Sequence, residues 1–189
     1  MTDKYIDIDA VLEAKAPSLK KKLPGFVVSY LKRIVHEDEL NVFLSKNWNE
    51  EGITFIGNFL AELGISYEVD GADKLPESGR NTFVCNHALG GLDGIILLKM
   101  LCDKYGEAKV VVNDILMYIS PMKSLFIPVN VVGDKQNKES VSLIDESMES
   151  EIPILYFPAG KVSRRDKNGN TFSLATWAVL GWFIMQYGE

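Results

Sequence analysis

The chain has 189 residues, of which 47% are hydrophobic and 24% are charged, and its formal net charge is −6. This composition is typical of one globular domain, and the negative charge argues against a nucleic-acid-binding protein. Two cysteines without CxxC spacing argue against a disulfide scaffold, and two histidines are too few for a histidine-built zinc site. The first residues lack the basic-then-apolar pattern of a signal peptide, so we expect one cytoplasmic domain over residues 1–189.

Residues 1–64 are predicted to form a helical N-terminal region. Asp9 is placed to cap a short helix that begins at AVLEAK, and Pro24 suits the first position of the helix GFVVSYLKRIV. Apolar residues at helical spacing predict a third helix in HEDELNVFLSKNW. A fourth helix is expected in GITFIGNFLAELG, where Gly64 would end it.

Residues 65–189 are predicted to form the α/β core. Helices are expected at LDGIILLKMLCDKYG and KESVSLIDESMES, among strands at ISYEV (65–69), TFVCN, AKVVVN, LFIPVNVV and IPILYFP. Strands that alternate with helices indicate an α/β fold, a mixed sheet flanked by helices. Ligand groups in such folds gather on the loops that leave the strand ends. We therefore expect the loops NHALGGLD and FPAGKVSRR to meet in one cleft.

The C-terminal segment differs from the rest of the chain. No charged residue occurs between Asn168 and Gly188, and the centre of this segment, FSLATWAVLGWFIMQY, is rich in aromatic residues. It is short for a membrane-spanning helix, which needs about 20 apolar residues. Its length favours a buried or interfacial segment over a membrane span.

The stretch FVCNHALGGLDG contains the residues best suited to catalysis. His87 follows a predicted strand, and Asp93 begins the next predicted helix, with five residues between them. A neutral imidazole is available as a base near pH 7, and a carboxylate bonded to its other nitrogen fixes the tautomer. A turn through Gly90 and Gly91 would fold the carboxylate back onto the imidazole. Because the chain has no GxSxG nucleophile elbow, we expect His87 to deprotonate a substrate hydroxyl.

Two alternatives remain for these residues. In the first, His87 is a polar residue at a strand end and Asp93 only caps a helix, as aspartates commonly do. In the second, Cys85 shares a strand face with His87 and acts as a nucleophile. A buried strand cysteine is the simpler interpretation of Cys85.

NHALGGLDG after an apolar strand, with IPILYFPAGKVSRR some 70 residues downstream, resembles the glycerolipid (lysophospholipid) acyltransferase family. This family includes 1-acylglycerol-3-phosphate acyltransferase. The family motif has four residues between His and Asp, and the Gly-Gly form with five resembles a bacterial branch of lipid acyltransferases. The resemblance implies that His87 is the general base and that Asp93 orients it. The implied substrate contacts are Asn86, Gly90, Gly91, Asn130, Phe157, Pro158, Gly160, Lys161, Ser163 and Arg164.

The resemblance also implies the co-substrates and partners. The donor would be a thioester on acyl carrier protein or coenzyme A, and the acceptor a membrane lipid. No metal and no permanently bound cofactor are implied. The chain departs from the family pattern at Asn130, Ala159 and Val162, where an arginine, a glutamate and an arginine are usual. Because arginine suits a phosphate, these departures argue against a simple lysophosphatidate acceptor, and a lyso-aminolipid is a rival to the lysophospholipids.

The segment KKKLPGFVVSYLKRIV combines basic and apolar residues. A basic amphipathic helix can lie on an anionic lipid surface, although an ordinary helix packed on the sheet explains the same pattern. A lipid acceptor requires membrane access, so we expect a peripheral protein at the inner face of the plasma membrane.

The leading hypothesis is an acyltransferase that esterifies a lysolipid hydroxyl in membrane lipid synthesis. The chain ends soon after FPAGKVSRR, where the family continues, so we expect a C-terminally shortened core. The alternative hypothesis is therefore a truncated, catalytically inactive lipid-binding or membrane-associated protein. A hydrolase, in which water replaces the lipid acceptor, is a third hypothesis.

Overall fold

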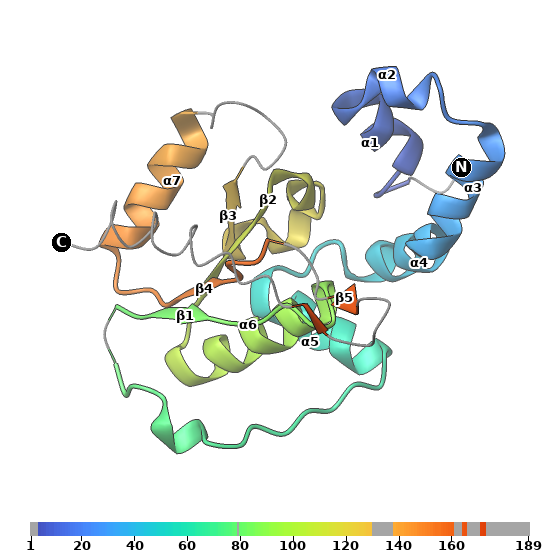
Figure 1. Ribbon diagram of the computed structural model, residues 1–189. Coiled ribbons are helices and arrows are strands. Elements are labelled where there is room, and N and C mark those ends of the chain that lie inside the picture. Colours follow the sequence, from blue (N-terminus) through green and yellow to red (C-terminus); the bar gives the residue numbers. More distant parts are fainter. Residues whose placement is uncertain (1–3, 79, 130–137, 161–163, 166–170, 173–189) are drawn as a thin grey trace.

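The computed structural model of the protein describes residues 4–78, 80–129, 138–160, 164–165 and 171–172 (Figure 1). The predictions for Asn130, for residues 161–163 and for the C-terminal segment 173–189 lie outside the described residues. The described part confirms an α/β fold in which helices flank a sheet.

Four parallel strands form the sheet: β1 (Thr82–Val84), β2 (Lys109–Asn113), β3 (Phe126–Val129) and β4 (Ile154–Tyr156). Their order is β1-β4-β2-β3, so the last strand in sequence lies between the first two. Leu155 pairs with Phe83 on one side and with Val110 on the other. Its side chain is completely buried, because helices cover both faces of a parallel sheet.

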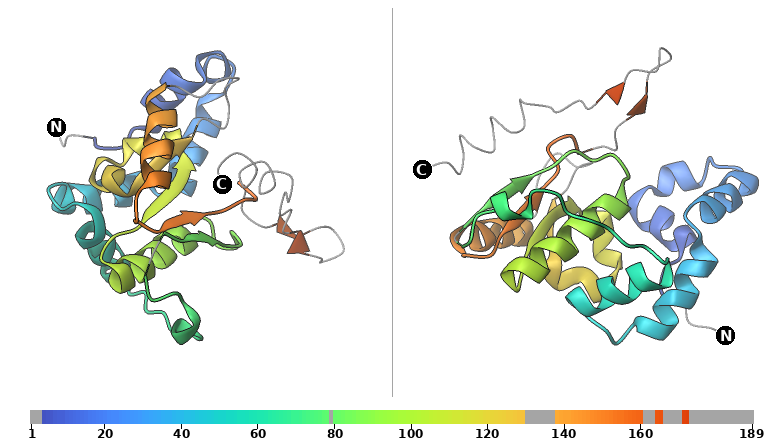
Figure 2. Two further views of the ribbon diagram at one scale, coloured as in Figure 1. Left: turned by 90° about the vertical axis from the view of Figure 1, so that its left-hand side faces the viewer. Right: turned by 90° about the horizontal axis from the view of Figure 1, so that it is seen from below.

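The connections place helices on both faces of the sheet. Helix α6 (Gly91–Tyr105) joins β1 to β2, and α7 (Lys138–Glu149) joins β3 to β4. The connection from β1 to β2 passes over β4, and the connection from β3 to β4 passes over β2. The two connections therefore run in opposite directions across the sheet. Because parallel crossovers are right-handed, the two helices lie on opposite faces (Figure 2, left). The short helices η2 (Asp114–Tyr118) and η3 (Ser120–Leu125) connect β2 to its neighbour β3, and η1 (Ala72–Lys74) precedes β1.

Five helices precede the sheet: α1 (Ile8–Lys15), α2 (Pro17–Lys20), α3 (Gly25–Ile34), α4 (Glu37–Asn47) and α5 (Gly52–Glu62). Helix α5 packs on α6 and η3. Helices α1 to α3 stand beside the sheet, and α4 leads from them towards α5 (Figure 1). We call α1 to α4 the N-terminal lobe. Phe43 and Leu44 of α4 join the core with Phe55 and Ile56 of α5, so the lobe and the α/β part share buried apolar contacts.

Most predicted elements are confirmed, with differences at their ends. Residues 65–69 do not pair with any strand of the described part, so the strand predicted there is wrong. Ile65 and Tyr67 nevertheless pack against the core. Asp9 does not cap α1: Asp7 has the extended cap conformation, and its side chain accepts from Asp9 N at 2.9 Å. Pro24 is the N-cap of α3 and not its first residue.

The small strands β5 (Arg164–Arg165) and β6 (Thr171–Phe172) pair antiparallel with each other as a separate sheet. The sequence pattern did not predict them.

Candidate active site

His87 and Asp93 are in direct contact. The backbone N–H of Cys85 donates to the Tyr156 carbonyl at 3.0 Å. This hydrogen bond continues the pairing of β1 with β4 as far as Cys85, two residues before His87. His87 Nδ1 lies 2.8 Å from Asp93 Oδ1, and the two side chains are 21% and 13% exposed. In the tautomer that carries its hydrogen on Nδ1, His87 donates to this carboxylate oxygen, and the lone pair is on Nε2. The structure therefore brings the two side chains together, and their roles as base and orienter stay a prediction.

The loop between the two residues holds the carboxylate in place. Asp93 lies in the first turn of α6, and its second oxygen, Oδ2, accepts from the backbone N–H of Leu89 at 2.7 Å. Gly90, the N-cap of α6, has φ 71° and ψ −134°, a conformation that residues with a Cβ rarely adopt. Gly91 has no such φ, and a Cβ added to it would meet nothing within 4 Å. Only Gly90 therefore supplies the backbone freedom that the sequence assigns to both glycines.

Phe157 brings the downstream motif to this pair. It follows β4, the neighbour of β1, and the carboxyl ends of parallel strands meet at one edge of a sheet. The Phe157 ring lies 4.4 Å from the His87 ring, centroid to centroid, at an interplanar angle of 35°. The same ring covers the start of α6, 3.7 Å from where a Cβ on Gly94 would stand. Phe157 is 9% exposed, so it packs against the imidazole from the protein interior.

The chain turns back directly after Phe157. The N–H of Gly160 donates to the Phe157 carbonyl at 3.0 Å, and Gly160 has a left-handed φ of 56°. Pro158 is half-buried in this turn. The structure thus brings Phe157, Pro158 and Gly160 to the sheet edge that carries His87.

Cys85 is poorly suited to act as a nucleophile. Burial raises the pKa of its thiol, and the negative charge of Asp93 raises it further. A thiol with a raised pKa stays protonated near neutral pH, and only the thiolate is a strong nucleophile. Asn86, between Cys85 and His87, is exposed.

Several predicted substrate contacts are not placed by the structure. Asn130, Lys161 and Ser163 lie outside the described residues. Arg164 is described as backbone in β5. The predicted role of this basic loop therefore stays a prediction.

Neither a metal cluster nor a membrane span is found in the described part of the chain. No three His, Cys, Asp or Glu side chains come together there as a group that could hold a metal ion. None of the helices described is long and apolar enough to cross a bilayer.

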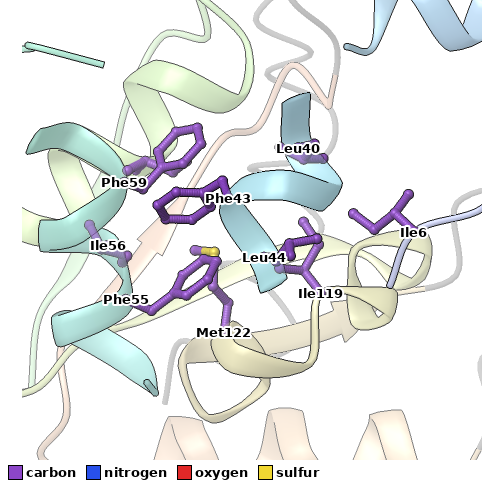
Figure 3. A pocket seen from close by; sticks show the side chains of 10 residues that line it. Ile6, Leu40, Phe43, Leu44, Phe55, Ile56, Phe59, Ile119 and Met122 are labelled. Atoms are coloured by element: carbon purple, nitrogen blue, oxygen red, sulfur yellow. The ribbon is translucent and has the colours of Figure 1, made fainter. Parts of the chain in front are cut away.

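An apolar cavity of about 70 Å³ lies in the core, apart from His87, Asp93 and Phe157, none of which lines it. Figure 3 shows side chains from α4, α5 and η3 turned towards one another around it. Ten apolar residues line the cavity: Ile6, Leu40, Phe43, Leu44, Phe55, Ile56, Phe59, Ile95, Ile119 and Met122. It is small beside the sites of about 300–1,000 Å³ that bind small molecules, so we regard it as a packing gap.

Sequence reasoning missed two features of the site. It assigned Phe157 to substrate binding and did not foresee its ring against His87, and it did not foresee the hydrogen bond from Leu89 to Asp93. An acidic residue in the first turn of a helix commonly accepts backbone N–H groups, so the second feature had a sequence indication. The first depends on β4 lying beside β1, which the sequence does not reveal.

Comparisons with known proteins show the family of the chain. Residues 10–178 match a family model described as "Acyltransferase". The chain is 43% identical over 165 residues to the lyso-glycine lipid O-acyltransferase of Bacteroides thetaiotaomicron, covering 87% of this chain and 60% of that protein. It is 43% identical over 161 residues to the protein of the same name from Phocaeicola vulgatus, covering 85% and 57%. The chain thus spans about three fifths of the length of these relatives. No solved structure matches the chain.

Proposed function

The chain belongs to the acyltransferase family, and from this premise we propose that it moves a fatty acyl group from a thioester donor to a lysolipid hydroxyl. His87 serves as the general base. The observation that carries this proposal is the 2.8 Å contact between His87 Nδ1 and Asp93 Oδ1, which leaves Nε2 available to accept a proton. General bases of this kind contribute about 10²–10⁴-fold to a reaction rate.

The proposed reaction has two proton transfers. Nε2 of His87 takes the proton of the acceptor hydroxyl while the hydroxyl oxygen attacks the thioester carbonyl carbon. The tetrahedral intermediate then collapses, the carbon–sulfur bond breaks, and the imidazolium returns the proton to the leaving sulfur. The products are an ester and a free thiol. Asp93 stabilises the imidazolium and keeps Nε2 facing the acceptor, while Phe157 restricts the ring from one side.

We propose a lyso-aminolipid as the acceptor. Both curated relatives are named lyso-glycine lipid O-acyltransferases. The sequence supports the same choice, because Ala159 and Val162 stand where the family motif has a glutamate and an arginine. An amino-acid head group lacks the phosphate that paired arginines bind best. The proposed contacts to acceptor and donor are Asn86, Gly90, Gly91, Asn130, Phe157, Pro158, Gly160, Lys161, Ser163 and Arg164.

The donor is a thioester of acyl carrier protein or coenzyme A. Because the acceptor is a membrane lipid, the enzyme works as a peripheral protein on the inner face of the plasma membrane. The anionic surface of that membrane is its second partner.

The test is acyl transfer by the purified chain. Radiolabelled acyl carrier protein and coenzyme A thioesters are supplied separately with detergent-dispersed lyso-glycine lipid or lysophosphatidate. We expect a labelled diacyl lipid from the lyso-glycine lipid, and a loss of at least about hundredfold in His87→Ala. Cys85→Ala is the matched control, two residues away, and should retain most of the activity.

Three results would contradict the proposal. Release of free fatty acid without labelled lipid would identify a hydrolase. A folded chain that binds lipid but transfers no label would be a lipid-binding protein. Full activity in His87→Ala would remove His87 from the mechanism.

A further inference from the structure

Helix α3 exposes a row of large apolar side chains. Phe26, Tyr30 and Ile34 are 76%, 55% and 54% exposed. They are spaced four residues apart, which places them on one side of the helix. Val27 and Leu31, each one position after a residue of this row, are half-buried. Helix α3 contacts α1 and α4. Helix α3 therefore has an inner side that faces the lobe and an outer apolar side.

Basic residues surround this row. Arg33 lies over the Tyr30 ring, with its guanidinium carbon 6.0 Å from the ring centroid. Lys21 and Lys22, both exposed, stand a few residues before the helix in sequence. Residues 14–36 contain no Asp or Glu, although the whole chain has a formal charge of −6. This stretch of sequence is thus net positive in a chain that is net negative.

Lys20 and Lys32, by contrast, pair with carboxylates of the lobe. Lys20 Nζ lies 3.0 Å from Glu13 Oε2 and 3.3 Å from Asp9 Oδ1. Lys32 pairs with Asp9 and lies 3.9 Å from the buried Glu37. These carboxylates neutralise Lys20 and Lys32. The five basic residues of KKKLPGFVVSYLKRIV look equivalent in the sequence. In the structure two of them pair with carboxylates of the lobe, and the other three, Lys21, Lys22 and Arg33, are exposed.

We propose that Phe26, Tyr30 and Ile34, with Lys21, Lys22 and Arg33 around them, dock the protein onto an anionic lipid bilayer. We call these six residues the α3 face. The inference rests on the proposed function in one respect: a lipid acceptor means that the enzyme works at a membrane. In Figure 1, α3 lies at the outer edge of the lobe, away from the sheet.

A bilayer fits this surface better than a protein partner for two reasons. The apolar side chains form a single row along one helix, which suits insertion among lipid head groups to a depth of about 5–10 Å. The exposed charged residues on the helix and shortly before it, Arg33, Lys21 and Lys22, are all positive, which complements anionic lipid and disfavours contact with a second copy of the same face. Each basic residue near such a surface strengthens partitioning about fivefold.

The test is sedimentation of the full chain with vesicles. We expect binding to vesicles of phosphatidylcholine with phosphatidylglycerol, weaker binding at high salt, and little binding to phosphatidylcholine alone. Phe26→Ser/Ile34→Ser and, separately, Lys21→Gln/Lys22→Gln/Arg33→Gln should each lower partitioning at least about tenfold. Val42→Ser/Leu63→Ser is the matched control, because it removes two apolar side chains of similar exposure outside α3.

The same variants separate this inference from the enzyme assignment. Circular dichroism checks that each is folded, and acyl transfer to detergent-dispersed acceptor should be unchanged in all of them. The uncharged C-terminal segment is present in every variant, so its contribution to binding is constant. Wild-type binding in both α3 variants would overturn the inference, and so would a dimer that dissociates only when the α3 face is changed. Vesicle binding through α3 without any acyl transfer would overturn the proposed function alone.

Discussion

The N-terminal lobe and the candidate active site contain two helices that begin alike. Helix α4 starts with Glu37 after His36, whose φ is 53°, and α6 has Asp93 in its first turn after Gly90, whose φ is 71°. Neither helix has a side-chain cap at its N-cap residue. Both carboxylates are well shielded, at 3% and 13% exposure. The two helices therefore begin with a similar local arrangement.

The partners of the two carboxylates make the difference. Glu37 accepts from Lys4 at 2.5 Å and from the Ile8 N–H at 2.8 Å, so it ties the start of the chain to α4. Its hydrogen bond raises the pKa of Lys4, which keeps that lysine charged. Asp93 instead contacts Nδ1 of His87, the residue that we propose as the general base. On the proposed mechanism, Glu37 therefore has a structural role, whereas Asp93 serves the general base.

The largest effect should follow from Asp93→Asn. The amide can no longer hold the imidazole in the required tautomer or stabilise its protonated form, so kcat should fall about 10²–10⁴-fold. Acyl transfer to detergent-dispersed acceptor at saturating donor measures this. Glu37→Gln is the counterpart in the lobe. Because we assign Glu37 a structural role, kcat of this variant should stay within about twofold of the wild-type value. Equal losses of kcat in both variants would end the distinction between the two carboxylates.

Glu37→Gln should act on stability. Hydrogen bonds to charged groups contribute about 1.5–3 kcal/mol each, so its free energy of unfolding should fall by about that amount. Urea denaturation followed by circular dichroism measures the change. Glu39→Gln provides the control, because Glu39 is 73% exposed and its replacement should stay within about 0.5 kcal/mol. If the two variants were equally stable, the network around Glu37 would be of no structural importance.

Gly90→Ala should cost about 1–2 kcal/mol, because a Cβ disfavours the positive φ at the start of α6. The strained turn should also displace Asp93 and reduce acyl transfer. Gly91→Ala is the matched control, since Gly91 has no left-handed φ and faces open space. Thermal unfolding and acyl transfer of the two variants are compared, and equal behaviour would show that the turn does not depend on Gly90.

His36→Gly is expected to have the smallest effect. Relief of the left-handed φ is offset by the greater freedom of glycine in the unfolded chain, so stability should rise by no more than about 1 kcal/mol. Urea denaturation measures this, with acyl transfer expected to be unchanged. A marked loss of stability would mean that the exposed His36–Glu39 contact at 3.5 Å contributes more than exposed pairs usually do.

Local pattern was sufficient for much of the fold. Helical spacing located α3, α4, α5 and α6 to within a few residues, and the alternation of strands and helices predicted the α/β class. The same reasoning failed at residues 65–69, where the alternation of Ile65 and Tyr67 is real but reflects contact with the core. Whether such a segment becomes a strand depends on a neighbouring strand with free hydrogen-bonding groups, which no local pattern contains.

The sequence by itself determined the residues of the candidate catalytic pair and the turn between them. His87 and Asp93 are six positions apart, and Gly90 allows the chain to reverse, so their contact needs only local geometry. Tertiary structure alone decided the strand order β1-β4-β2-β3, which brings Phe157 from 70 residues downstream against the imidazole. It also decided which lysines of the basic segment are neutralised by carboxylates and which face outwards. Both outcomes depend on contacts between segments distant in sequence, whose free energies are set by packing of the whole chain.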